Sequence, residues 1–226
     1  GDIGLDPALC PSPTVVIMTK PLHPPSPELY RNGVALIIAE TRRNLPSALS
    51  PQIKSTNFLN NILAKREAIA AGAFDSILLN WEQHLTECTV SNLFFVTEGC
   101  LRTPSVECGL LDGITRSIVI QLAKEQHIPT EEGRFTPEQL RQSSECFLTN
   151  TSMEIMPVAA VDRKPCRAVA VRKSWLYSGK FGAPVGSAGI RTSFARRSHS
   201  GDPRSSRIDR QEEPAMQLTE KHLEYW

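Results

Sequence analysis

Four short segments of this sequence carry groups that could act together on one ligand. Lys54 directly precedes a run with helical spacing, and Glu87 lies among small polar residues farther along the chain. Residues 113–116 include Thr115, and residues 149–152 are rich in hydroxyl and amide groups. Each segment begins or follows a regular element, where backbone N–H groups are free. The four segments supply an amine, a carboxylate and two anion cradles, which is the set needed to hold pyridoxal phosphate.

Lys54 is the candidate for the amine that forms a Schiff base with the cofactor aldehyde and then moves a proton at the substrate α-carbon. Such an amine must lose its proton readily, and we expect partial burial between Ile53 and Phe58 to favour this. Glu87 is the candidate for the carboxylate that keeps the pyridine nitrogen protonated. Taken singly, a solvated lysine and an exposed glutamate at a strand end are the simpler interpretations.

The phosphate group needs backbone N–H donors. Residues 113–115 begin a predicted helix whose free N–H groups and dipole favour an anion, and the Thr115 hydroxyl adds a donor. Residues 149–152, which include Thr151, form a second polar loop directly after a predicted strand. A helix cap and a polar turn explain each segment alone. The cysteine spacing predicts no zinc ribbon, and no metal site is expected.

The elements around these segments follow from hydrophobic spacing. Residues 57–71 form the clearest helix, with Asn57 as a cap and Gly72 as a stop, so Lys54 is expected at a fixed corner between a strand and this helix. Residues 115–126 form a second helix, and a third begins at Thr136. Apolar runs predict strands at residues 14–18, 33–39, 74–79, 93–96, 101–103, 146–148 and 157–161.

Composition is that of a globular protein, with 226 residues, 40% hydrophobic and 22% charged. The sequence has no run of apolar residues long enough for a membrane span and no secretory signal at residue 1. None of the six cysteines forms a C-x-x-C pair, and Cys88 and Cys146 lie in apolar runs as expected for core residues. These features favour reduced thiols and a cytoplasmic protein.

The charge distribution changes near residue 163. Residues 163–226 hold thirteen Lys and Arg against six Asp and Glu, a net charge of +7, whereas residues 1–162 carry −6. We expect a basic, largely irregular tail at 163–226. Nucleic-acid binding by its arginines is the alternative, but they lie among Ser and Gly with one nearby aromatic residue, so a solvated tail is favoured and no nucleic-acid partner is expected.

The same segments, taken in order, resemble the class IV aminotransferases, the fold-type IV pyridoxal phosphate enzymes, over residues 33–161. The motifs that carry the resemblance are residues 53–57 (IKSTN), 86–87 (TE), 91–94 (SNLF), 111–116 (LDGITR) and 154–158 (EIMPV). The resemblance implies an α/β (α+β) fold, a mixed β pseudo-barrel with flanking helices at 31–162. It also implies that residues 1–30 are a remnant of the small N-terminal domain and a linker.

By this resemblance Lys54 would be the Schiff-base lysine and Glu87 the partner of the pyridine nitrogen, while Ile114, Thr115 and Thr151 would hold the phosphate. The partners implied are an amino acid and a 2-oxo acid, within a homodimer. The family also has an N-terminal domain that supplies an arginine to the phosphate. Arg42 and Arg43 are not obvious replacements for that arginine.

The motifs indicate the cofactor more clearly than the substrate or the reaction. We expect an amino-acid aminotransferase of branched-chain type. The alternatives within the resemblance are an aminodeoxychorismate lyase that releases pyruvate, a D-amino acid aminotransferase and an inactive fragment of the family.

Overall fold

This computed structural model describes residues 3–166 of the chain. The predicted basic tail therefore lies outside the described residues, except for 163–166. Within 3–166 the strands are β1 (Val34–Ile38), β2 (Asp75–Leu79), β3 (Leu85–Cys88), β4 (Asn92–Thr97), β5 (Cys100–Pro104), β6 (Thr130–Gly133), β7 (Glu145–Asn150), β8 (Glu154–Val161) and β9 (Lys164–Pro165).

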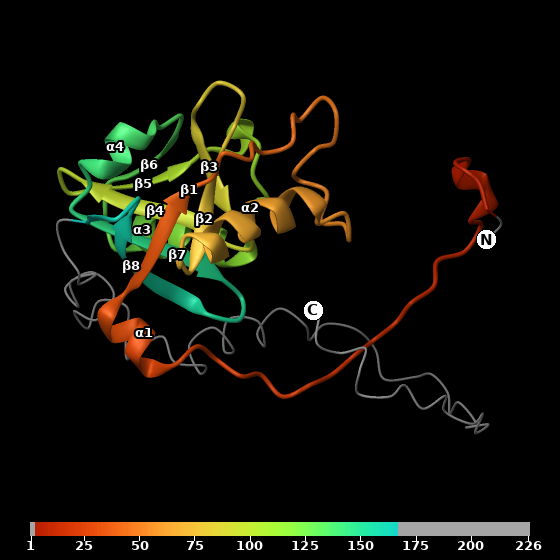
Figure 1. The fold of residues 1–226 in the computed structure, drawn as a ribbon, viewed down its shortest axis with the longest axis horizontal. Helices are drawn as coiled ribbons and strands as arrows, with labels where there is room; N and C mark the ends of the chain where they lie inside the picture. The colour runs from red at the N-terminus through yellow and green to blue at the C-terminus, as the bar shows by residue number, and fades with distance from the viewer. Residues whose placement is uncertain (1–2, 167–226) are drawn as a thin grey trace. The chain divides into compact units, whose positions relative to one another are not determined.

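Six of these strands close into a barrel. The hydrogen-bonded order β3-β2-β1-β8-β7-β4 returns to its start through the pairing of β3 with β4 (Figure 1). β1 runs parallel to both β2 and β8, and the other pairs around the barrel are antiparallel. β5 and β6 extend the sheet beyond β4, and β9 pairs with β8. The predicted mixed β pseudo-barrel is confirmed.

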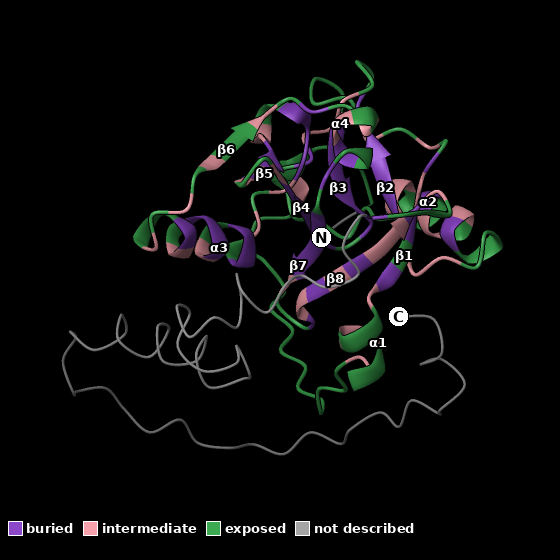
Figure 2. Ribbon diagram, turned by 90° about the vertical axis from the view of Figure 1, so that its left-hand side faces the viewer, coloured by how far each residue is buried: buried purple, intermediate pink, exposed green. Residues whose placement is uncertain are grey.

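β2, β3, β4 and β7 are almost wholly buried because the barrel interior and neighbouring elements cover them, whereas β6 and β9 are largely exposed (Figure 2). One core cluster, which includes Leu36, Ile77 and Leu148, fills the barrel, and a second packs between β4, β7 and helix α3 (Ile114–Glu125). In the second cluster the Phe94 and Phe147 rings stack with centroids 5.1 Å apart. Full burial of a side chain of this size contributes about 1.5–3 kcal/mol.

Helices lie where the chain must cross between strands. The predicted helix 57–71 is confirmed as α2 (Leu59–Ala70), which packs small residues, Ala64 and Ala68, against the sheet. Its predicted cap is wrong, because Phe58 and not Asn57 is the N-cap, and no side chain caps the helix. The predicted helix 115–126 is confirmed as α3. Thr136 caps α4 (Pro137–Arg141) in a capping box with Gln139, as its sequence predicts. The remaining helices described are α1 (Pro27–Asn32), η1 (Pro7–Leu9) and η2 (Val106–Cys108).

The structure corrects the expected strand at residues 14–18. Val15, Ile17 and Met18 are almost fully exposed, and the segment has no regular structure. Strand propensity alone does not form a strand, since the backbone N–H and C=O groups need a neighbouring strand as partner. Cys88 and Cys146, by contrast, are buried in the core as predicted. Among residues 3–166 the helices are too short or too polar to cross a membrane.

Candidate active site

One cavity of about 340 Å³ opens at an end of the barrel, where loops and helix starts converge. Its wall combines the loop between β1 and α2, the β3–β4 hairpin, the start of α3 and the turn between β7 and β8. All five predicted site residues line this cavity: Lys54, Glu87, Ile114, Thr115 and Thr151. Segments separated by almost a hundred residues in sequence thus meet around one space.

Lys54 enters the cavity from the long loop that joins β1 to α2. The side chain is exposed, and its apolar neighbours Ile53 and Phe58 are 61% and 37% exposed. The expectation that these two neighbours partly bury Lys54 at a strand-to-helix corner was therefore wrong. The loop packs inward through the buried Pro51, and this leaves the side chains that follow it directed toward solvent and the cavity.

Glu87 lies inside β3, not at a strand end, and is 6% exposed. Its Oε1 is 2.8 Å from Nη2 of Arg43, and its Oε2 accepts hydrogen bonds from the Leu111 N–H at 3.1 Å and from Nδ2 of Asn92 at 3.3 Å. Burial raises the pKa of Glu87 to about 7, and the charge of Arg43 and the Leu111 N–H offset part of that effect. The Glu87 carboxyl group therefore changes its protonation state near pH 7.

Arg43 is a site residue that the sequence did not reveal. Its side chain is 9% exposed, and Nη1 donates to the side-chain oxygens of Asn60 and Asn61 in the first turn of α2, each at 3.2 Å. The adjacent Arg42 instead donates to backbone oxygens and to Gln83 near the surface. Two neighbouring arginines look alike in sequence, and only the path of the loop decides which one faces the carboxylate.

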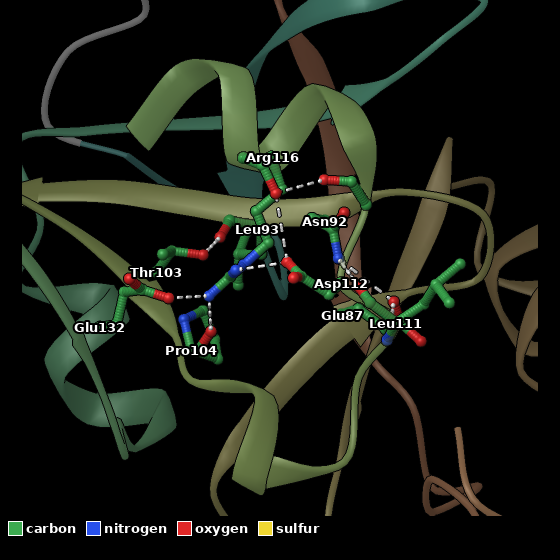
Figure 3. A network of polar contacts seen from close by, with 11 residues as sticks. Glu87, Asn92, Leu93, Thr103, Pro104, Leu111, Asp112, Arg116 and Glu132 are labelled. Carbon is green, nitrogen blue, oxygen red and sulfur yellow. Dashed lines mark hydrogen bonds and ion pairs between the residues drawn. The ribbon is translucent and has the colours of Figure 1, made fainter. Parts of the chain in front are cut away.

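The start of α3 forms the candidate anion cradle. Gly113 is the N-cap and makes no side-chain capping hydrogen bond, so backbone N–H groups of the first turn remain available to a ligand. The buried Arg116, which is 2% exposed, joins this turn to the neighbouring strands (Figure 3). Its guanidinium contacts Asp112 at 2.8 Å, Glu132 at 2.7 Å and the Pro104 carbonyl at 3.0 Å. The cradle is thereby fixed to β5 and β6.

Replacement of Gly113 by alanine is expected to lower the free energy of unfolding by about 1–3 kcal/mol. An added Cβ would collide with Oδ1 of Asn92, a buried side chain that is held by two hydrogen bonds and cannot move aside. Urea denaturation measures the loss. Ser117→Ala, in the same helical turn but exposed, is the matched control and should stay within about 0.5 kcal/mol of wild type. Equal effects of the two changes would contradict the predicted collision.

The donor set of the cavity fits pyridoxal phosphate. Thr149 lines the cavity, and within residues 3–166 its buried Oγ1 has no hydrogen-bond partner. Thr151 follows two residues later, in the turn between β7 and β8, and also lines the cavity. A cavity with an amine, a buried carboxylate, a helix N-terminus and an unpaired hydroxyl offers partners to an aldehyde, a ring nitrogen and a phosphate.

Comparison with known proteins places this barrel and cavity in a family. The family model for amino-transferase class IV matches residues 1–161. A Methanocaldococcus jannaschii protein provisionally named a branched-chain-amino-acid aminotransferase is 40% identical over 162 residues, which cover 72% of this chain and 55% of the relative. The aminodeoxychorismate lyase of Bacillus subtilis is 35% identical over 150 residues, 66% of this chain and 50% of the lyase.

A crystal structure shows the same relationship. The Thermobaculum terrenum branched-chain amino acid aminotransferase in its PLP (holo) form superposes with a TM-score of 0.59 and 34% identity, over 60% of this chain and 45% of that one. The chain belongs to the class IV aminotransferase family. It spans about half the length of these relatives.

Proposed function

We propose that the protein is a pyridoxal-phosphate-dependent aminotransferase of branched-chain type, which moves an amino group between an amino acid and a 2-oxo acid. The observation that carries the proposal is that Lys54, Glu87 and the uncapped start of α3 line one cavity. The branched-chain assignment is supported by relatives and structures of that name. The homodimer and the cytoplasmic location remain predictions that accompany it.

Each residue then has a defined task. When bound, pyridoxal phosphate supplies an aldehyde and an electron-withdrawing pyridine ring. Lys54 provides the nucleophilic amine and the base that moves a proton at the substrate α-carbon. Glu87 would keep a proton on the ring nitrogen, and the charge of Arg43 favours the ionised form of Glu87 that this task requires. Ile114, Thr115 and Thr151 bind the phosphate by backbone and hydroxyl donors.

Covalent trapping tests the proposal. Borohydride reduction after incubation with pyridoxal phosphate is expected to fix one pyridoxyl group per chain, and peptide mapping is expected to find it on Lys54. Incubation with pyridoxamine phosphate, which has no aldehyde, followed by the same borohydride treatment is the matched control and should leave Lys54 unmodified. A protein that takes up no pyridoxyl group, or takes it up at scattered lysines, would sink the proposal.

A lyase activity is the second candidate, because the Bacillus subtilis relative that covers two thirds of this chain is an aminodeoxychorismate lyase. The same Lys54 would serve both reactions, and a D-amino acid aminotransferase would use it as well. Parallel assays separate them. Amino transfer from L-valine to 2-oxoglutarate without pyruvate release supports the branched-chain proposal, pyruvate release from aminodeoxychorismate supports the lyase, and transfer from D-alanine supports the D-amino acid enzyme.

A further inference from the structure

Asn92 is a buried residue that lies between Glu87, at one end of the cavity, and the start of α3, at the other. It begins β4, is 6% exposed, and lies opposite Glu87 in the β3–β4 pair and opposite Thr149 in the β4–β7 pair. Both of these neighbours line the cavity. Asn92 therefore lies in the sheet between two cavity residues, Glu87 on β3 and Thr149 on β7.

The carboxamide of Asn92 closes a ring of hydrogen bonds (Figure 3). Its Nδ2 donates to the Leu111 carbonyl at 2.8 Å and to Oε2 of Glu87 at 3.3 Å. The Leu111 N–H donates to the same Oε2 at 3.1 Å. Both hydrogens of the amide and both polar groups of the Leu111 backbone are thus used, and they tie the loop before α3 to Glu87.

The oxygen of the same carboxamide contacts the start of α3. Gly113 packs so closely on Oδ1 of Asn92 that no Cβ fits between them. The loop at 111–113 is held by Asn92 on one side, and Arg116 holds the following helical turn on the other. The charged groups that act on Glu87 are Arg43 and Lys54, both from the loop after β1, so Asn92 adds a neutral link between Glu87 and α3.

We propose that Asn92 is a positioning residue that fixes the Glu87 carboxylate and the anion-binding start of α3 relative to each other. The inference rests on the proposed function in one respect: a single ligand, a ring that carries a phosphate group, must contact both Glu87 and the start of α3. A ligand held at both ends gains affinity only when the spacing of the two ends is set in advance. Loss of the link should therefore weaken a two-ended ligand more than a one-ended one.

Amide hydrogen exchange on the protein without ligand tests the link directly. Asn92→Ala is expected to raise the exchange of two hydrogen-bonded amides by about tenfold or more, since a buried carbonyl and a carboxylate each lose a donor. These are the Leu111 N–H, which donates to Glu87, and the Ser117 N–H, which donates to the Gly113 carbonyl at 3.0 Å. Thr103→Val is the matched control: it removes a buried hydroxyl that donates to the Leu93 carbonyl at 2.8 Å, outside the cavity wall. Unchanged exchange in Asn92→Ala, or the same change in Thr103→Val, overturns the proposal.

Asn92→Asp separates positioning from simple loss of packing, because it keeps the shape and removes the donor. The introduced carboxyl group lies beside Glu87, so at high pH the two carboxylates repel and neither can donate. Exchange protection of Leu111, corrected for intrinsic rates, should be low there and recover as acid gives the pair an O–H donor; wild type at the same pH is the reference, because Glu87 titrates in both proteins. Protection that does not vary with pH would contradict the role of the donor.

Ligand affinity provides the second arm. Asn92→Ala is expected to lower the affinity for pyridoxal phosphate by about tenfold or more, and the affinity for inorganic phosphate by much less. Equal losses for the two probes would overturn the spacing argument. If the wild-type protein takes up no pyridoxal phosphate, the proposed function fails, while the exchange measurements still decide whether Asn92 links Glu87 to α3.

Discussion

Replacement of Lys54 by alanine is expected to abolish covalent uptake of pyridoxal phosphate and to lower amino transfer by about 10²- to 10⁴-fold or more. Lys54 is the lysine that lines the cavity also lined by Glu87 and the start of α3. Without its amine, both attachment of the cofactor and proton movement at the substrate α-carbon lose their chemical group. Mass spectrometry after borohydride reduction measures the first effect, and a coupled assay measures the second.

The exposure of Lys54 makes this variant easy to interpret. Its side chain packs against little, so Lys54→Ala should leave the free energy of unfolding within about 0.5 kcal/mol of wild type. Lys54→Arg keeps the charge but loses the nucleophile, and should be as inactive as alanine. Lys124→Ala, on the exposed face of α3 and outside the cavity wall, is the matched control and should retain full labelling. Labelling of Lys54→Ala at wild-type level would refute the assignment.

Apolar runs predicted five of the six barrel strands, namely β1, β2, β4, β7 and β8, and hydrophobic spacing predicted the two long helices. β2, β4 and β7 are buried along nearly their whole length, and such strands appear in sequence as continuous apolar runs. β3 was not predicted, because its central residues are polar. Thr86 and Glu87 are buried there only because the Leu78 carbonyl, Arg43 and the Leu111 N–H supply partners from elsewhere in the fold.

The types of the site residues were predicted, whereas their surroundings were not. Lys54 and Glu87 were identified by motif and chemistry, and both line the cavity. Partial burial was expected for Lys54, which is exposed, and the burial of Glu87 was not predicted. Burial depends on how distant segments pack, and neither the path of the 39–58 loop nor the position of Arg43 within it follows from local spacing.

Replacement of Arg43 by alanine is expected to lower the free energy of unfolding by about 3–5 kcal/mol at pH 8. The change leaves the Glu87 carboxylate buried without the guanidinium that lies 2.8 Å away. It also removes the donors to Asn60 and Asn61 that fasten the loop to α2. Arg42→Ala, one residue earlier and near the surface, is the matched control and should cost less than about 1 kcal/mol.

The loss should depend on pH in a direction fixed by Glu87. Burial raises the pKa of Glu87 to about 7, so between pH 4.5 and 7 the folded protein binds more protons at this group than the unfolded chain does, and stability falls as pH rises. Removal of Arg43 raises that pKa further and extends the fall above pH 7. At pH 5 Glu87 is protonated in both proteins, and the difference between them should shrink to the lost hydrogen bonds. Urea denaturation at pH 5 and pH 8.5 measures both differences, and equal losses would contradict the buried ion pair as their cause.

The same pairing connects stability to chemistry. Glu87 can hold a proton on a ring nitrogen only when it is itself ionised, and Arg43 favours that form. In Arg43→Ala the acidic limb of the activity profile should therefore move to higher pH, in step with the stability profile. A Glu87→Gln, Arg43→Ala double variant has no titrating carboxyl group at this position, so its stability relative to Glu87→Gln should be independent of pH. A pH-dependent difference between those two variants would show that another group, and not Glu87, responds to Arg43.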